Sequence, residues 1–202
     1  MKPIIAIDID GVTLDYKAAY ARKWQRAFGR MPRIKNPKAA KLWEYYDIPH
    51  LAKDSPELAK LEAAADDDFW STMPPMGQAV SAVRLIRSYG YRTISVSAAP
   101  NCQAENRAFN LARHGFEMDD VICNQIDGAI SPKTQIINDM QPAYFVDDYI
   151  NYFHGVNRSV KKVLINEPEN HPSEHVSLAE MDLVLPSLFS FALWLRDYDN
   201  RS

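Results

Sequence analysis

The chain has 202 residues, of which 47% are hydrophobic and 24% charged, and its net charge is −3. These values are ordinary for a globular protein and allow one domain, or a core with one inserted subdomain. The slight negative charge argues against nonspecific nucleic-acid binding, and no apolar run reaches membrane-spanning length. Because two cysteines are too few for a disulfide framework and the N-terminus lacks a signal-peptide pattern, we expect a cytoplasmic protein without a membrane partner.

The first predicted element is a strand at residues 4–7, which is followed by Asp8, Asp10 and Gly11. Its apolar residues would occupy both faces of a sheet, which indicates a central parallel strand covered by helices. In such sheets ligands bind beyond the carboxyl ends of the strands. Two carboxylates at that position repel each other, and a divalent cation would offset the repulsion. The alternative interpretation is a strand that ends in a solvated turn.

Residues 15–72 show no strand pattern and contain several aromatic residues, with breaks at Pro32, Pro37, Pro49 and Pro56. This segment is too long for a simple connection between a strand and a helix. We therefore predict a helical cap at residues 15–72, inserted into a core formed by residues 1–14 and 73–202.

From residue 76 onward, helix and strand patterns alternate. Helices are predicted at 79–89, 103–114, 133–140 and 186–198, and strands at 91–97, 121–123, 143–148 and 160–166. This alternation predicts an α/β fold, in which helices cover both faces of a parallel sheet. For the apolar helix at 186–198 we favour burial in the core, the alternative being a homodimer face.

Polar residues of a particular kind follow the predicted strands or begin a predicted helix. They are Asp8 and Asp10, Ser97, Lys133, and Asp147 with Asp148. Each feature is weak alone, because a serine after a strand is usually a turn residue and a lysine at a helix start is usually solvated. Together they bring carboxylates, one ammonium and one hydroxyl to one edge of a sheet, which suits a phosphate group and a hard cation.

This combination resembles the haloacid dehalogenase-like (HAD) superfamily of phosphohydrolases, over residues 4–16 and 76–148. The resemblance implies a three-layer, Rossmann-like core with a small helical cap after the first strand. It also implies hydrolysis of phosphate monoesters. Val12 after the aspartate pair, the stretch at 69–100 and the spacing from Lys133 to Asp147 look closer to the deoxyribonucleotidase branch.

The resemblance implies a role for each acidic residue. Asp8 would be the nucleophile, forming an aspartyl-phosphate, and a ligand of Mg²⁺. Asp10 would bind the metal through its backbone carbonyl and serve as general acid and then general base. Asp148 is our preferred metal ligand of the last pair, with Asp147 orienting a water molecule or Lys133, although the reverse assignment stays open.

The same resemblance places the phosphate oxygens against Ser97, the amide of Ala98 and Lys133, whose ammonium would neutralise developing charge. The chain departs from the deoxyribonucleotidase pattern at Ala98, where a second hydroxyl residue is common. Asn101 is a candidate to replace the missing hydrogen bond.

The predicted cap offers aromatic side chains that could stack on a nucleobase. We assign most of them to the core of the cap and select Tyr16, Trp43, Phe69 and Trp70 as substrate-binding candidates. The expected substrate is therefore a (deoxy)nucleoside 5′-monophosphate. The alternatives are another small phosphorylated metabolite, such as a sugar phosphate, and a binding or regulatory protein that keeps the fold without catalysis.

Residues 16–43 contain nine lysines and arginines and no acidic residue. This cluster could steer an anionic substrate, form a nucleic-acid surface, or be a solvated helix face. We expect no nucleic-acid partner, since the chain is acidic overall and has no recognised binding motif. We interpret the acidic run at 66–68 as a helix end or linker, and we expect no zinc site at His171 and His175, which lie in a loop pattern.

Overall fold

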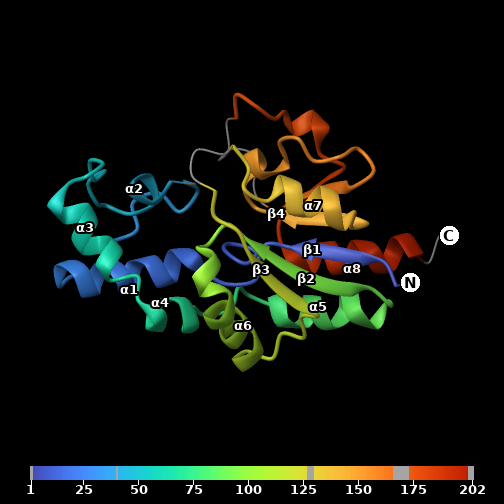
Figure 1. Ribbon diagram of the computed structural model, residues 1–202, viewed down its shortest axis with the longest axis horizontal. Coiled ribbons are helices and arrows are strands. Elements are labelled where there is room, and N and C mark those ends of the chain that lie inside the picture. Colours follow the sequence, from blue (N-terminus) through green and yellow to red (C-terminus); the bar gives the residue numbers. More distant parts are fainter. Residues whose placement is uncertain (1, 40, 127–129, 166–172, 200–202) are drawn as a thin grey trace.

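The computed structural model describes residues 2–39, 41–126, 130–165 and 173–199, and it is built around a six-stranded parallel sheet (Figure 1). The strand order is β3-β2-β1-β4-β5-β6. The strands are β1 (Ile4–Ile7), β2 (Arg92–Ser97), β3 (Asp120–Cys123), β4 (Tyr144–Asp147), β5 (Lys161–Ile165) and β6 (Leu183–Leu185). The predicted parallel sheet is confirmed.

Strand β1 lies at the centre of the sheet and is buried on both faces. Ile5 and Ile7 belong to the core on one face, whereas Ala6 belongs to the core on the other. All three side chains are fully buried. The alternation follows from the two-residue period of a strand, and it confirms the central position predicted from the apolar run.

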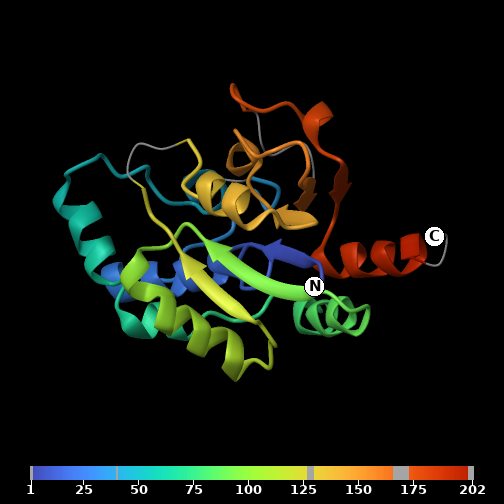
Figure 2. The ribbon, with the colours of Figure 1, turned by 45° about the vertical axis from the view of Figure 1, so that its right-hand side comes forward.

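Helices cover both faces of the sheet, which gives the three layers seen in Figure 2. The helices α5 (Ala79–Ser88), α6 (Ala104–Arg113) and α8 (Leu188–Asp199) contribute to the core that contains Ile5 and Ile7. The opposite face is covered by α7 (Thr134–Met140) and the 3₁₀ helix η2 (Ile150–Phe153). Among the residues that the structure describes, no helix is long and apolar enough to cross a membrane.

The predicted strands and helices of the core agree with the observed ones to within about two residues at each end. Strand β6 was not predicted. It has three residues, too few to show a period in the sequence, and it forms by pairing with β5 at the edge of the sheet.

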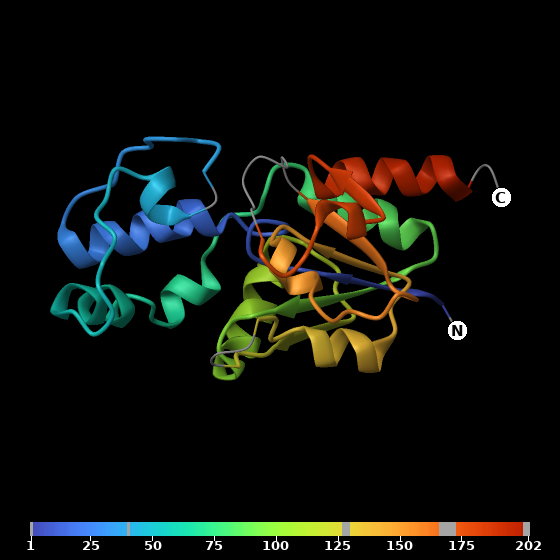
Figure 3. The same cartoon turned by 90° about the horizontal axis from the view of Figure 1, so that it is seen from above.

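The described residues between β1 and residue 76 form four helices, and this segment lies to one side of the sheet (Figure 3). They are α1 (Tyr16–Phe28), α2 (Leu42–Tyr45), α3 (Pro56–Ala63) and α4 (Asp67–Ser71). Helix α1 is capped at its N-terminus by the side chain of Asp15 and ends at Gly29, which has a positive φ of 76°. Trp24, Ala27 and Leu61 form a separate small core between α1 and α3. The helical character agrees with the predicted cap.

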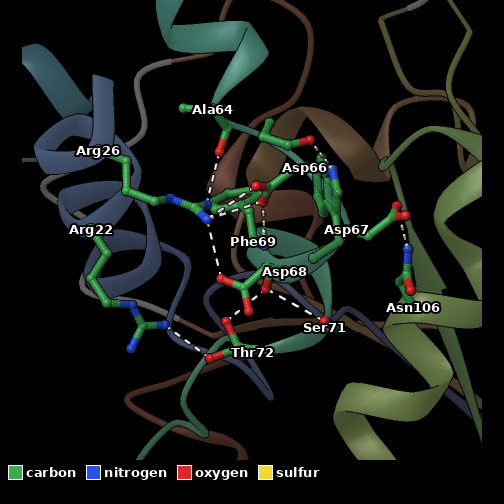
Figure 4. A network of polar contacts seen from close by, with 12 residues as sticks. Arg22, Arg26, Ala64, Asp66, Asp67, Asp68, Phe69, Ser71, Thr72 and Asn106 are labelled. Atoms are coloured by element: carbon green, nitrogen blue, oxygen red, sulfur yellow. Dashed lines mark hydrogen bonds and ion pairs between the residues drawn. The ribbon is translucent and has the colours of Figure 1, made fainter. Parts of the chain in front are cut away.

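The acidic run at the start of α4 connects this helix to its neighbours (Figure 4). Asp66 caps α4, because its side chain accepts a hydrogen bond from the Phe69 amide at 2.9 Å. Arg26 of α1 forms ion pairs with Asp66 and Asp68, at 3.0 and 3.1 Å. On the other side, Asn106 of α6 donates a hydrogen bond to Asp67 at 2.8 Å. The run therefore forms a helix terminus, the first of the two alternatives given for it above, and not a linker.

Helix α8 packs its apolar face into the core, which confirms the favoured interpretation of this segment. Phe191, Ala192 and Leu195 are fully buried, and the Phe191 ring lies 5.3 Å from the Tyr144 ring, measured between centroids.

Replacing Phe191 with alanine should lower the free energy of unfolding by about 3–5 kcal/mol, because the substitution opens a cavity in the main core. Urea denaturation measures this change. Phe109→Ala is the matched control, since Phe109 is 61% exposed, and it should change stability by less than about 0.5 kcal/mol. Equal losses for the two variants would contradict the packing of α8 described above.

Candidate active site

The site lies where the strand order reverses. Strand β1 has β2 on one side and β4 on the other, so the connections leave in opposite directions and open a crevice beyond the carboxyl ends. Three predicted residues meet at this edge: Asp8 directly follows β1, Ser97 ends β2, and Asp147 ends β4. The placement follows from the parallel sheet and not from closeness in sequence.

Lys133, directly before α7, joins two of these strands. Its Nζ donates a hydrogen bond to Asp8 Oδ1 at 2.5 Å and another to Asp147 Oδ2 at 2.7 Å. It also lies 4.4 Å from the centre of the Tyr152 ring. Burial alone would lower the pKa of Lys133, but the carboxylates of Asp147 and Asp8 outweigh burial and raise it above its usual value. The lysine is therefore a fixed positive charge at the end of β1.

The acidic residues form a group that can hold a cation. Oxygen atoms of Asp8, Asp147 and Asp148 lie within 4.8 Å of one another. Burial raises the pKa of each carboxyl group, and repulsion from the neighbouring carboxylates raises it further at Asp8 and Asp148. Three carboxylates face one ammonium, so ionisation leaves an excess of negative charge. An oxygen-rich, negatively charged group of this kind fits Mg²⁺.

The two members of the last acidic pair differ in position. Asp147 is fully buried, and its other oxygen, Oδ1, accepts a hydrogen bond from the Tyr149 amide at 2.9 Å. Asp148 lines the cavity described below, whereas Asp147 does not. Asp148 therefore lies at the cavity, whereas Asp147 lies behind it and bonds to Lys133.

Gly11 lets the turn after β1 approach the acidic group closely. Its φ is +85°, and a Cβ atom added there would lie 2.1 Å from Asp148 Oδ2. The turn is held by the Thr13 hydroxyl, which donates to the backbone carbonyls of Asp8 and Ile9, at 3.3 and 3.1 Å. Only glycine fits this position without moving Asp148.

Asp10 is held by a residue that the sequence analysis missed. Arg107 of α6 forms an ion pair with Asp10 Oδ1 and is fully buried. A signal existed: Arg107 lies four residues before Leu111, on the apolar face of a predicted amphipathic helix, where a charge needs a partner.

The two predicted phosphate-binding residues at the end of β2 differ in exposure to the cavity. Ala98 lines the cavity. The Ser97 hydroxyl is fully buried, donates to Asp10 Oδ2 at 3.4 Å and accepts a hydrogen bond from the Ala99 amide at 3.2 Å. Asn101, the candidate for the missing hydrogen bond, lies outside the cavity lining, and its side-chain oxygen accepts from the Gln125 amide instead.

A cavity of about 730 Å³ opens over the acidic group. Residues of the core that line it include Asp8, Asp10, Lys133, Asp148, Tyr149, Tyr152, Ile165, and Pro186 and Ser187 with Leu188, the first residue of α8. The helical segment contributes Asp15, Tyr16, Lys17, Lys41, Leu42 and Trp43. The volume is within the range of small-molecule sites.

Two of the four aromatic candidates line this cavity, namely Tyr16 and Trp43. The other two have packing positions, which corrects the expectation. Phe69 is 3% exposed in the main core, with its ring centre 6.0 Å from that of Tyr16, and Trp70 donates from Nε1 to the Ala65 carbonyl at 3.1 Å. Phe69 and Trp70 do not line the cavity because they lie on α4, a capped helix that packs against α6. The sequence showed their spacing but not this long-range contact.

Of the basic residues at 16–43, some line the cavity and others bind α4. Lys17 and Lys41 line the cavity, and Lys17 Nζ donates to the Ala39 carbonyl at 3.0 Å. Arg22 and Arg26 are instead bound to the end and the start of α4, as Figure 4 shows. Of the two histidines considered for zinc, His171 lies outside the described residues and His175 is exposed.

Comparisons with known proteins identify the fold. No family model and no curated protein matches the sequence. Solved structures do match. A haloacid dehalogenase-like hydrolase from Streptococcus pneumoniae has a TM-score of 0.62 at 16% identity, with 98% of both chains covered.

A HAD family hydrolase from Deinococcus radiodurans, with bound phosphate and sodium, has a TM-score of 0.62 at 13% identity and 98% coverage of both chains. The L-2-haloacid dehalogenase from Xanthobacter autotrophicus has a TM-score of 0.64 at 12% identity, covering 97% of this chain and 99% of that chain. The fold is HAD-like.

Replacing Gly11 with alanine should lower the free energy of unfolding by about 1–3 kcal/mol, because the new Cβ is strained at positive φ and collides with Asp148. Gly77→Ala is the matched control: Gly77 also lines the cavity, but an added Cβ there meets no atom within 4 Å. Urea denaturation of both variants measures the difference. If the two variants were equally stable, the close approach of Gly11 to Asp148 would be disproved.

Proposed function

We propose that this protein is a Mg²⁺-dependent phosphomonoester hydrolase that acts through an aspartyl-phosphate on Asp8. The observation that carries the proposal is the buried Lys133, bonded to Asp8 and Asp147 beside Asp148, at the floor of an open cavity. A dianionic phosphate repels an anionic nucleophile, so positive charge must stand next to the attacking oxygen. Lys133 supplies one such charge.

In the proposed reaction a carboxylate oxygen of Asp8 attacks phosphorus, and the bond between phosphorus and the ester oxygen breaks. Asp10 enters this step protonated and donates its proton to the departing alkoxide, which leaves as an alcohol. A water molecule then attacks the phosphorus of the aspartyl-phosphate while Asp10 accepts its proton. The second step releases inorganic phosphate and restores both carboxyl groups.

Asp8, Asp148 and the backbone carbonyl of Asp10 would hold Mg²⁺, with Asp147 behind them. When bound, the cation supplies charge neutralisation for phosphate oxygens and carboxylates alike. Lys133 keeps the Asp8 oxygen in place and offsets charge on the phosphoryl group. The Ala98 amide, at the cavity wall, is the proposed donor to a phosphate oxygen, with Ser97 behind it.

For the substrate we propose a nucleoside or deoxynucleoside 5′-monophosphate. Trp43 and Tyr16 offer aromatic faces at the cavity, and Lys17 and Lys41 add positive charge there. The likeness of the sequence motifs to the deoxyribonucleotidase branch supports the same choice. A sugar phosphate is the second candidate, since the cavity would hold either molecule.

The fold alone does not choose between hydrolysis of phosphate esters and dehalogenation, because both occur among the similar structures. The Deinococcus protein is described with bound phosphate, whereas the Xanthobacter protein is a haloacid dehalogenase. The clustering of Asp8, Asp147 and Asp148 favours the phosphatase, because three adjacent carboxylates suit a divalent cation, which offsets the charge of a phosphate group and is not needed to displace a halide.

Phosphate release from nucleoside monophosphates should require Mg²⁺ and stop when a chelator removes it. Asp8→Asn should reduce the turnover at least about a thousandfold, since it removes the nucleophile. Asp148→Asn should raise the Mg²⁺ concentration needed for half-maximal activity. Colorimetric phosphate release, with Mg²⁺ varied from chelator upward, measures all three effects.

Asp139→Asn is the matched control, because Asp139 is exposed on α7 and bonds only locally to Gln135. It should leave the activity unchanged. Full activity of Asp8→Asn would refute the assigned nucleophile. Binding of Mg²⁺ without phosphate release from any nucleotide or sugar phosphate would instead favour a binding or regulatory protein.

Trp43→Ala tests the nucleotide assignment. Loss of one stacking contact of about 1–3 kcal/mol should lower kcat/KM for nucleoside monophosphates roughly 5-fold to 150-fold. Hydrolysis of glycerol phosphate, which has no base, should not change. Phe109→Ala, which removes an exposed aromatic ring elsewhere, should affect neither substrate. Equal loss on both substrates would contradict base stacking at Trp43 and favour a sugar phosphate or another small ester.

A further inference from the structure

Arg107 is a charged side chain inside the protein with no place in the reaction as described so far. It is fully buried, and it does not line the cavity. Among the described residues, the carboxylate with which it forms an ion pair is that of Asp10. Arg107 has two further contacts with described residues that carry no full charge: one terminal nitrogen lies 2.8 Å from Met73 Sδ, and the guanidinium lies 5.5 Å from the centre of the Trp70 ring.

Such an arrangement is costly for folding. A buried ion pair usually stabilises a protein no more than apolar residues of the same size, because both charges lose their hydration. Arg107 also leaves its Nε without a hydrogen-bond partner. A contribution to folding stability therefore does not explain why an arginine is buried at position 107.

The pair instead controls the direction of the Asp10 carboxylate. Oδ1 is bound by Arg107, and Oδ2 accepts a hydrogen bond from the Ser97 hydroxyl at 3.4 Å. The backbone around Asp10 is held separately, by the bridge between Asp10 and Leu14 and by the Thr13 hydroxyl, which donates to the carbonyls of Asp8 and Ile9. The orientation of the Asp10 side chain therefore depends on its own contacts. This side chain is 26% exposed, and Asp10 lines the cavity.

We propose that Arg107 is a positioning residue for the general acid and base Asp10. This inference rests on the proposed function and extends it to a residue that never meets the substrate. Proton transfer depends on the distance and direction of the carboxyl group relative to the ester oxygen. Arg107 sets both by holding one oxygen of Asp10 from behind, while the second oxygen keeps its bond to Ser97.

The test uses two esters that differ in their need for an acid. An alkyl phosphate, such as glycerol phosphate, leaves as a poor alkoxide and needs a proton, whereas p-nitrophenyl phosphate has a good leaving group. Their kcat/KM values report the steps up to the aspartyl-phosphate. Arg107→Met should lower kcat/KM about 100-fold for the alkyl ester and less than about 5-fold for the aryl ester.

A double-mutant cycle with Asp10→Asn sharpens this test. Once Asp10 is replaced, Arg107→Met should lower kcat/KM for the alkyl ester by less than about 2-fold more, because the two residues act as one unit. Arg113→Met is the matched control: it lies on the same helix, is exposed and donates to the Ser71 carbonyl, but does not contact Asp10. It should leave the ratio of the two esters unchanged.

Equal losses on both esters, or additive effects in the cycle, would overturn the proposal. If Arg107→Met does not fold, Arg107→Lys keeps a buried cation without the planar fork, and at least about a 10-fold loss confined to the alkyl ester is expected.

Crystal structures of the wild type and the variant decide the question without activity. The Asp10 carboxylate should leave Ser97 in the variant, and an unmoved carboxylate would reject the positioning role. Failure of the wild type to hydrolyse either ester would refute the phosphatase while leaving this structural result to decide the role of Arg107.

Discussion

The salt bridge of Lys133 with Asp8 and Asp147 is the interaction on which the rest of the site depends. It joins the end of β1, the end of β4 and the start of α7, three segments that are far apart in sequence. All three groups are buried, so each would be unfavourable alone, and removing one would leave the others without a counter-charge. The site is therefore a single electrostatic unit. Its charge balance also makes it a candidate cation site, since the carboxylates of Asp8, Asp147 and Asp148 outnumber the single ammonium of Lys133.

The position of that unit follows from the sheet. Because β1 is flanked by β2 and β4, residues that follow these strands converge whatever lies between them. This is why Asp8, Asp147 and Asp148 could be predicted from the sequence: a strand pattern and an acid at its end are local signals. The core helices and the helical character of residues 15–72 were predictable for the same reason. The apolar periodicity of these helices and the prolines that break them are visible within windows of about a dozen residues.

What could not be predicted depends on contacts between distant segments. Strand β6 exists because β5 offers it a partner. Phe69 and Trp70 looked like residues of a binding site, but α4 turns them toward the core and α6. The partner of Asp10 was equally hidden, because 97 residues separate it from Arg107. An arginine on an apolar helix face indicates that some carboxylate must approach it, although the sequence does not say which one.

The two parts of the helical segment at residues 15–72 contact the core differently. Near its end, α4 is bound by Asn106, and the Met73 carbonyl accepts a hydrogen bond from His114 at 2.9 Å. Arg107 packs against the same return segment through Met73 and Trp70 while it holds Asp10. The other part of the segment, around α2, meets the cavity through Leu42 and Trp43. The contacts of Arg107 thus lie at the end of the segment that is bonded to α6, whereas Leu42 and Trp43 belong to the part that lines the cavity. Under the proposed function, a change around Trp43 would alter which ester is accepted while the contacts that hold Asp10 stay in place.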